Sequence, residues 1–206
     1  ASAAGKTLKV GLLGCGGRGT QDAMNLLAGN EGVELVALAD LFEDHLEARR
    51  KQLAEHNDPK ISGKVKVKDS MCFVGWDAYQ KILDTDIDLI METCTPYVRP
   101  KHLEAAVEAG KHIFAEKPVA TDTHGLQRFR KAMAAHKAKG LSMSAGTQFR
   151  HDQARIQTME KVHGGAIGDV VGMQCYYCGA LPFSVKRNEG WSNLEYQLRN
   201  WYNYRW

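Results

Sequence analysis

Short apolar runs recur along the first 148 residues of the chain, separated by segments of different periodicity. In most of these runs apolar residues stand at neighbouring positions rather than only at every second one, which is typical of strands buried on both faces of a parallel sheet. The predicted strands are residues 8–13, 33–39, 87–93, 111–115 and 141–145, with 65–67 as a further short candidate.

Apolar residues at helical spacing predict helices in the segments between these strands. Those helices are residues 21–28, 43–56, 77–83, 100–109 and 122–139. Thr121 is the expected N-cap of the last helix and Gly140 its stop. Residues 57–64 contain Pro and Gly and are expected to form a loop. The repeated β-α order predicts a doubly wound α/β domain with helices on both faces of the sheet.

The pattern changes after residue 148. A helix is predicted over 152–162 and a strand over 170–177, and the last sixteen residues are polar and aromatic, with Trp191, Trp201 and Trp206. We therefore expect residues 1–148 to form the parallel α/β domain and residues 149–206 to begin a second domain that is too short to stand alone.

Composition narrows the function classes without choosing one. Of the 206 residues, 44% are hydrophobic and 25% are charged, which is ordinary for a globular protein. The net charge of +3 is small and the basic residues are scattered, so no nucleic-acid partner is expected. No apolar run reaches the roughly 18 residues of a membrane span, so no membrane partner is expected either. The small residues at the N-terminus leave export and a cytoplasmic location equally open.

The five cysteines do not predict a disulfide framework, because their number is odd and the chain is large enough to do without one. Cys175 and Cys178 form a C-x-x-C pair, but no second pair follows at the spacing of a zinc ribbon. We interpret both as ordinary strand cysteines and predict no metal site.

The strongest chemical signal is the turn Gly14-Cys15-Gly16-Gly17-Arg18-Gly19, between the first predicted strand and the first predicted helix. In this G-x-G-x-x-G arrangement the first glycine permits a tight turn, the second lets a pyrophosphate approach the backbone, and the third lets the helix pack closely. The helix N-terminus offers free N–H groups to the phosphates, and Arg18 adds a charged contact. The turn predicts a Rossmann-type dinucleotide-binding domain.

Asp40 lies 21 residues after Gly19, at the end of the second predicted strand. A carboxylate at this position accepts hydrogen bonds from ribose hydroxyls and repels a 2′-phosphate. Leu41 and Phe42 follow it, and no Arg or Lys stands close by in sequence to receive that phosphate. The pattern favours NAD over NADP, and we expect Leu41 beside the cofactor as well.

Polar residues also follow three later strands of the predicted sheet. Ligands of an open parallel sheet bind beyond the carboxyl ends of its strands, so we expect these residues to gather at the cofactor edge. They are Thr95, Pro96 and Tyr97 with nearby His102, then Glu116, Lys117 and Pro118, and finally Thr147, Gln148 and Arg150.

Together these motifs resemble the Gfo/Idh/MocA family of glucose–fructose oxidoreductases and inositol dehydrogenases. The resemblance rests on Val10-Gly11-Leu12-Leu13 with the glycine turn, on Thr95-Pro96 with His102, and on Ala109-Gly110-Lys111-His112 leading into Glu116-Lys117-Pro118. It implies NAD(P)-dependent hydride transfer at a carbinol carbon of a sugar, polyol or cyclitol. It also implies that residues 149–206 begin an α+β substrate domain with a mostly antiparallel sheet.

The resemblance implies roles for individual residues. It assigns Thr95, Pro96, His102 and Gln148 to the cofactor, Glu116 and Lys117 to the nicotinamide and substrate side, and Arg150 to the substrate. Tyr97 stands where many members have Asn, so the sequence departs from the family pattern at this position. Each of three residues also has a structural alternative. His102 is alternatively a hydrogen-bonded histidine at a helix start, and Arg150 is alternatively a structural ion-pair partner. For Gln148 a functional and a structural role are likewise both open.

Lys117 is the expected catalytic residue. A free lysine has a pKa of about 10.4, so making Lys117 half-neutral at pH 7 would cost about 4–5 kcal/mol, and neighbouring Glu116 opposes that change. We predict that Lys117 stays protonated and donates a hydrogen bond to the substrate oxygen, while a His or Asp elsewhere takes the proton. A cis Lys117–Pro118 bond is a further hypothesis.

Members of the family continue well past the position of Trp206, so we expect this chain to be C-terminally truncated. Two rival functions stay open. Some relatives use NAD to cleave glycosidic bonds by oxidation, elimination and re-reduction, and an inactive nucleotide-binding fragment or sensor is the other. The full-length form is expected to be a homo-oligomer, and the residues present do not name the substrate.

Overall fold

The computed structural model describes residues 5–179 and 182–204. The chain divides into two compact units, residues 1–147 and 148–206, and each is described by itself.

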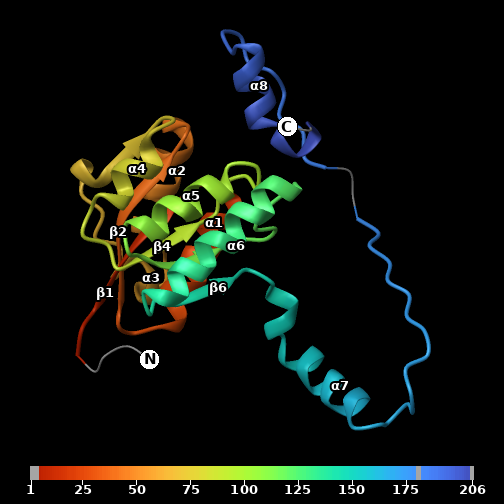
Figure 1. Ribbon diagram of the computed structural model, residues 1–206. Helices are drawn as coiled ribbons and strands as arrows, with labels where there is room; N and C mark the ends of the chain where they lie inside the picture. The colour runs from red at the N-terminus through yellow and green to blue at the C-terminus, as the bar shows by residue number, and fades with distance from the viewer. Residues whose placement is uncertain (1–4, 180–181, 205–206) are drawn as a thin grey trace. The chain divides into compact units, whose positions relative to one another are not determined.

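Six parallel strands form the centre of the first unit, in the order β3-β2-β1-β4-β5-β6. Figure 1 labels β1, β2, β4 and β6 of this sheet. Between β1 and β4 the strand order reverses, and an open α/β sheet binds ligands in the crevice beyond the strand ends at such a point. The bounds of the strands are β1 Leu8–Leu13, β2 Val33–Asp40, β3 Cys72–Val74, β4 Leu89–Glu92, β5 His112–Ala115 and β6 Met143–Ala145. The predicted Rossmann-type α/β fold is confirmed.

Helices cover both faces of this sheet. Successive residues of a strand point to opposite faces, so neighbouring side chains of β1 pack against different helices. Leu12 packs in a core cluster with side chains of α1, α2 and α3, whereas Leu13 packs with side chains of α4, α5 and α6. The bounds of the helices are α1 Gly17–Gly29, α2 Glu43–Ala54, α3 Pro59–Ser62, α4 Ala78–Leu83, α5 Arg99–Glu108 and α6 Thr123–Ala138, with the 3₁₀ turn η1 at Asp69–Met71.

Three local predictions for this unit are wrong. The N-cap of α6 is Asp122 rather than Thr121, since the Asp122 carboxylate accepts the Gly125 N–H at 2.7 Å. The predicted loop 57–64 contains α3, which Asp58 caps by accepting the Lys60 N–H at 2.9 Å. Residues 65–67 form only an isolated bridge to β2, and the edge strand is β3 instead.

The second unit contains the 3₁₀ turn η2 (Gln148–His151), α7 (Gln153–His163), α8 (Asn193–Arg199) and the 3₁₀ turn η3 (Trp201–Asn203). The strand predicted over 170–177 is wrong, because that segment is exposed and pairs with no strand in the described part of the unit. The described residues of this unit form no sheet, and Trp206 lies outside them. Cys175 and Cys178 are free and exposed.

Asn200 organises the end of the second unit. Its side chain is 1% exposed and accepts the Val185 N–H at 2.7 Å, while its amide donates to the carbonyls of Val185 and Tyr196. One amide therefore ties α8 to the segment that precedes it. Across the described residues of both units, no helix combines the length and apolar character that a membrane crossing requires.

Candidate cofactor and active site

The glycine turn connects β1 to α1 at the strand-order reversal. Gly14 has φ +98°, and a Cβ on it would lie 2.7 Å from the Cys94 backbone nitrogen. A Cβ on Gly19 would lie 2.2 Å from both the Gly14 carbonyl oxygen and the Thr93 Oγ1. Thr93 Oγ1 also donates to the Gly14 carbonyl at 2.7 Å. Side chains at these two positions would push the turn away from β4.

Gly16 and Gly17 face open space instead. Both are exposed, and a Cβ on either would meet no atom within 4 Å. Gly16 is the N-cap of α1, no side chain caps its first N–H groups, and no acid stands in its first turn. The first N–H groups of a helix have no partner inside the helix. This end of α1 therefore offers backbone donors and a partial positive charge to an anion.

Asp40 ends β2 beside this turn and is 7% exposed. Its Oδ2 accepts the Cys15 N–H at 2.6 Å and its Oδ1 accepts the Phe42 N–H at 2.8 Å. Burial raises the pKa of Asp40, and the two N–H donors act against that rise. Each oxygen has a second lone pair, so the carboxylate can still accept a hydroxyl. The Cys15 side chain points into the core, and burial raises the pKa of its thiol.

Glu116 and Lys117 follow β5 at the same sheet edge. Glu116 is 5% exposed, and its carboxylate accepts the Lys117 N–H at 3.0 Å. A Cβ on Gly146 would lie 2.3 Å from Glu116 Oε1, so the end of β6 closes tightly over this carboxylate. The Lys117 side chain is exposed, and the Lys117–Pro118 bond is cis, as hypothesised.

A second acid, Asp22 of α1, lies close to Glu116. Its Oδ2 is buried without a hydrogen-bond partner in the described structure, and Arg18 Nη1 is 3.8 Å from its other oxygen. Burial raises the pKa of Asp22 to about 6, the negative charge of Glu116 adds to the effect, and Arg18 lowers it. The edge therefore holds a carboxyl with a pKa of about 6, which the sequence did not predict.

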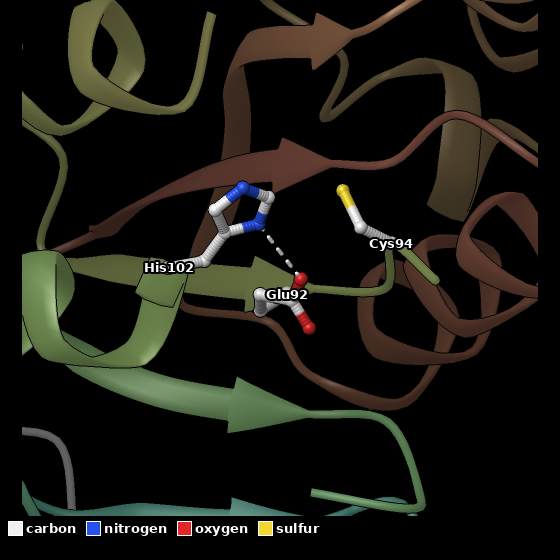
Figure 2. Close-up of side chains that lie close together, drawn as sticks. All are labelled: Glu92, Cys94 and His102. Carbon is white, nitrogen blue, oxygen red and sulfur yellow. Dashed lines mark hydrogen bonds and ion pairs between the residues drawn. The ribbon is translucent and has the colours of Figure 1, made fainter. Parts of the chain in front are cut away.

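A buried ion pair joins β4 to the start of α5. Arg99 and Glu92 are 2% and 1% exposed, and Arg99 Nε donates to Glu92 Oε2 at 2.5 Å. The other Glu92 oxygen lies 3.1 Å from His102 Nδ1 (Figure 2). The His102 ring stacks on Tyr79, with ring centroids 4.6 Å apart. His102 thus occupies the environment of a satisfied helix-start histidine.

Glu92, Cys94 and His102 place potential metal-ligand atoms within 4.8 Å of one another (Figure 2). Both Glu92 oxygens already have nitrogen partners, one of them a guanidinium. Burial raises the pKa of the Cys94 thiol well above its usual range, with the charge of Glu92 as a further cause. A thiolate is the form that binds metal, so these contacts favour an ion-pair cluster over a metal site.

Thr95 and Pro96 follow β4 in the turn that leads to α5, half-buried, and Tyr97 beside them is 53% exposed. Gln148 and Arg150 are exposed on η2, at the start of the second unit. Leu41 is half-buried directly after β2. The first unit therefore brings together the glycine turn, Asp40 and the residues that follow β4 and β5, while Gln148 and Arg150 belong to the other unit.

The fold and this edge define a Rossmann-type dinucleotide-binding α/β protein. Residues 8–145 match the model of the Gfo/Idh/MocA oxidoreductase family, described as having an NAD-binding Rossmann fold. The chain belongs to this family.

Curated relatives are named inositol 2-dehydrogenases. Inositol 2-dehydrogenase 3 of Saccharopolyspora erythraea is 28% identical over 171 residues, covering 83% of this chain and 45% of the relative. Inositol 2-dehydrogenase of Salmonella typhimurium is 27% identical over 163 residues, covering 79% of this chain and 43% of the relative. The chain thus spans less than half the length of these relatives.

A solved structure has a similar fold. The apo scyllo-inositol dehydrogenase of Lactobacillus casei superposes with a TM-score of 0.65 at 25% identity, over 80% of this chain and 44% of that one.

Sequence reasoning missed Asp22, Glu92 and Arg99. An acid at the end of the apolar run 87–93 was a usable signal for Glu92, because a buried carboxylate requires a partner. Arg99, seven residues later, reads as an ordinary solvated cation at a helix start. Asp22 stands among polar neighbours on α1 and carries no comparable signal.

Proposed function

We propose that the protein is an NAD-dependent oxidoreductase that moves a hydride between nicotinamide and a carbinol carbon of a polyol, sugar or cyclitol. The observation that carries the proposal is the shared edge of the sheet: the uncapped start of α1, Asp40 and Lys117 all follow the carboxyl ends of parallel strands. The first two suit a dinucleotide, and the third supplies a cation for a reacting oxygen.

The residues present fit a dinucleotide. Gly16 and Gly17 leave open space where side chains would otherwise stand, and the N–H groups behind them have no capping side chain. We propose that this turn holds the pyrophosphate, with Cys15, Arg18 and the close-packed Gly14 and Gly19 completing it. Asp40 would accept the ribose hydroxyls beside Leu41, which favours NAD over NADP. When bound, the nicotinamide ring accepts or returns the hydride.

Lys117 is the proposed catalytic residue. Its exposed ammonium would donate a hydrogen bond to the substrate oxygen and stabilise negative charge that develops there. Glu116 accepts the Lys117 backbone N–H and so supports the turn that carries the side chain. Thr95, Pro96 and His102 would border the cofactor from the β4 side, with His102 acting mainly through Glu92.

We propose a cyclitol or related polyol as the substrate class, since the relatives named above are inositol dehydrogenases. Residues 1–148 would serve as the cofactor domain, and residues 149–206, with Gln148 and Arg150 near the boundary, would begin the substrate domain. A homo-oligomeric full-length protein without nucleic-acid or membrane partners is part of the same proposal.

The test uses protein made from the complete coding sequence, with a panel of cyclitols, polyols and sugars and with NAD or NADP. We expect steady NADH formation with at least one cyclitol, and a slower reaction with NADP. Lys117→Met should lower kcat by about 10²–10⁴-fold while NAD still binds. Lys137→Met is the matched control, because Lys137 is an exposed lysine in the last turn of α6, outside the proposed site.

Two results would replace the proposal. Release of a sugar from a glycoside without net NADH would indicate oxidation, elimination and re-reduction instead. NAD binding without turnover on any substrate would indicate a nucleotide-binding module. A Lys117→Met variant with near-normal kcat would remove the catalytic role of this lysine while leaving the rest of the proposal intact.

A further inference from the structure

The Arg99 side chain bonds one carboxylate and two backbone carbonyls, and these acceptors lie on two segments at the cofactor edge. Its Nε donates to Glu92 at the end of β4, its Nη2 donates to the Cys94 carbonyl, and its Nη1 donates to the Pro118 carbonyl. Cys94 directly precedes Thr95, and Pro118 directly follows Lys117. One guanidinium thus links the turn after β4 to the turn after β5.

Arginine suits this position for a geometric reason. Its planar guanidinium presents donors in a fixed fork, so one group can bond several acceptors that lie in different directions. Arg99 is also the first residue of α5, and side chains of a helix lean toward its N-terminus, which carries this group past the helix start. A lysine would offer a point charge that cannot hold the same three acceptors in one plane.

Glu92 compensates the buried positive charge of Arg99. A cation at a helix N-terminus opposes the helix dipole, and a buried guanidinium without a counter-charge is costly. The Glu92 carboxylate supplies that charge, and His102 holds its second oxygen, as Figure 2 shows. The Glu92 carboxylate, which lies between Arg99 and His102, therefore holds the guanidinium in place.

We propose that Arg99 is a positioning residue that holds the turn carrying Lys117 in register with the turn carrying Thr95 and Pro96. This inference rests on the proposed function, because it assumes that Lys117 meets the substrate beside the cofactor. A displacement of about 1 Å at a reacting group is enough to cost about 10²-fold in rate. Loss of the guanidinium should therefore affect turnover more than cofactor affinity, since the hydrogen bonds of Arg99 in the described structure go to Glu92, Cys94 and Pro118 and not to the glycine turn.

The test compares Arg99→Lys with Arg128→Lys. Arg128 of α6 pairs with Glu104 of α5 through a similar fork, but it is partly exposed and bonds no backbone carbonyl of the two turns. The measurements are kcat and KM for the substrate, the Kd for NAD, and hydrogen exchange of residues 93–98 and 116–121. A stabilising role confined to folding would slow turnover only in proportion to the folded fraction.

For Arg99→Lys we expect kcat to fall by about 10- to 100-fold, the NAD Kd to stay within about 3-fold, and both turns to exchange faster. Arg128→Lys should match the wild type. Arg99→Lys with wild-type kcat and exchange would overturn the proposal. If Arg99→Lys does not fold, the double variant Glu92→Met/Arg99→Met removes both buried charges together, and the same two readouts decide.

Two further outcomes separate the role of Arg99 from the proposed function and from a metal site. If the wild type turns over no substrate, the proposed function fails, and faster exchange of the two turns in Arg99→Lys still decides whether Arg99 holds them. Stoichiometric zinc bound by the wild type and lost in Cys94→Ser, measured by equilibrium dialysis with zinc chloride, would make the cluster in Figure 2 a metal site and overturn the proposal.

Discussion

Asp22 makes the stability of the protein depend on pH in an unusual direction. Burial, with a further contribution from Glu116, raises the pKa of Asp22 from 3.8 to about 6. The folded protein therefore holds this proton more tightly than the unfolded chain does. The stabilisation is fully present below the unfolded pKa and is lost as pH rises through the folded pKa, whereas most carboxylates behave in the opposite way.

The magnitude follows from the difference between the two pKa values. A difference of about two corresponds to about 3 kcal/mol, of which about 2 kcal/mol is lost between pH of about 4.5 and about 8. The Asp22 side chain is 11% exposed, and solvent screening lowers these figures, so about 2 kcal/mol is the upper value of the pH-dependent part. Asp22→Asn has nearly the same shape and no ionisation. The variant should therefore gain about 2 kcal/mol relative to the wild type over that pH range.

Urea unfolding followed by far-UV circular dichroism measures this difference, with both proteins in the same buffers. Asp77→Asn is the control: Asp77 is exposed, and a hydrogen bond from Lys81 lowers its pKa, so its contribution changes with pH in the opposite sense. Glu116→Gln should flatten the pH dependence of the wild type. A stability difference between Asp22→Asn and wild type that stays constant with pH would refute the reasoning.

Three other predictions use the same structure. Gly19→Ala should destabilise by about 1–3 kcal/mol in thermal melts, because its Cβ would lie 2.2 Å from the Gly14 carbonyl oxygen, whereas Gly16→Ala, in open space, should leave Tm unchanged and weaken NAD binding in a fluorescence titration. Asp40→Asn should weaken NAD binding by about tenfold and narrow the preference over NADP, measured in parallel titrations. Asn200→Ala should speed hydrogen exchange of residues 183–204 by removing three hydrogen bonds worth about 1 kcal/mol each.

Features encoded in neighbouring residues were predictable from the sequence. The apolar runs located β1 and β2 to within one residue, because strands buried on both faces carry neighbouring apolar residues along most of their length. Gly14 and Gly19 were predictable for a related reason: steric limits on the backbone decide both positions. The Asp40 prediction followed from the fixed spacing of one β-α-β unit.

Features that depend on distant partners were not predictable. The segment 170–177 has the residue types of a strand but no neighbouring strand in the described part of its unit, and a strand requires a partner for its backbone groups. Arg99 differs from its expected environment in the opposite way. Its place at a helix start predicts an exposed side chain, yet it is buried among acceptors at the end of β4 and in the turns after β4 and β5. The sequence pattern specifies which face of an element is apolar, but not what will cover it.

The hydrogen-bond partners of the acids at the cofactor edge explain how a dinucleotide phosphate could bind beside them. Asp40 is stabilised by the N–H groups of Cys15 and Phe42, Glu116 by that of Lys117, and Glu92 by Arg99. None of these acids uses the N–H groups at the start of α1, which also has no acid in its first turn. The N–H donors that suit a pyrophosphate therefore stay available to it, although the buried Asp40 carboxylate lies beside the turn.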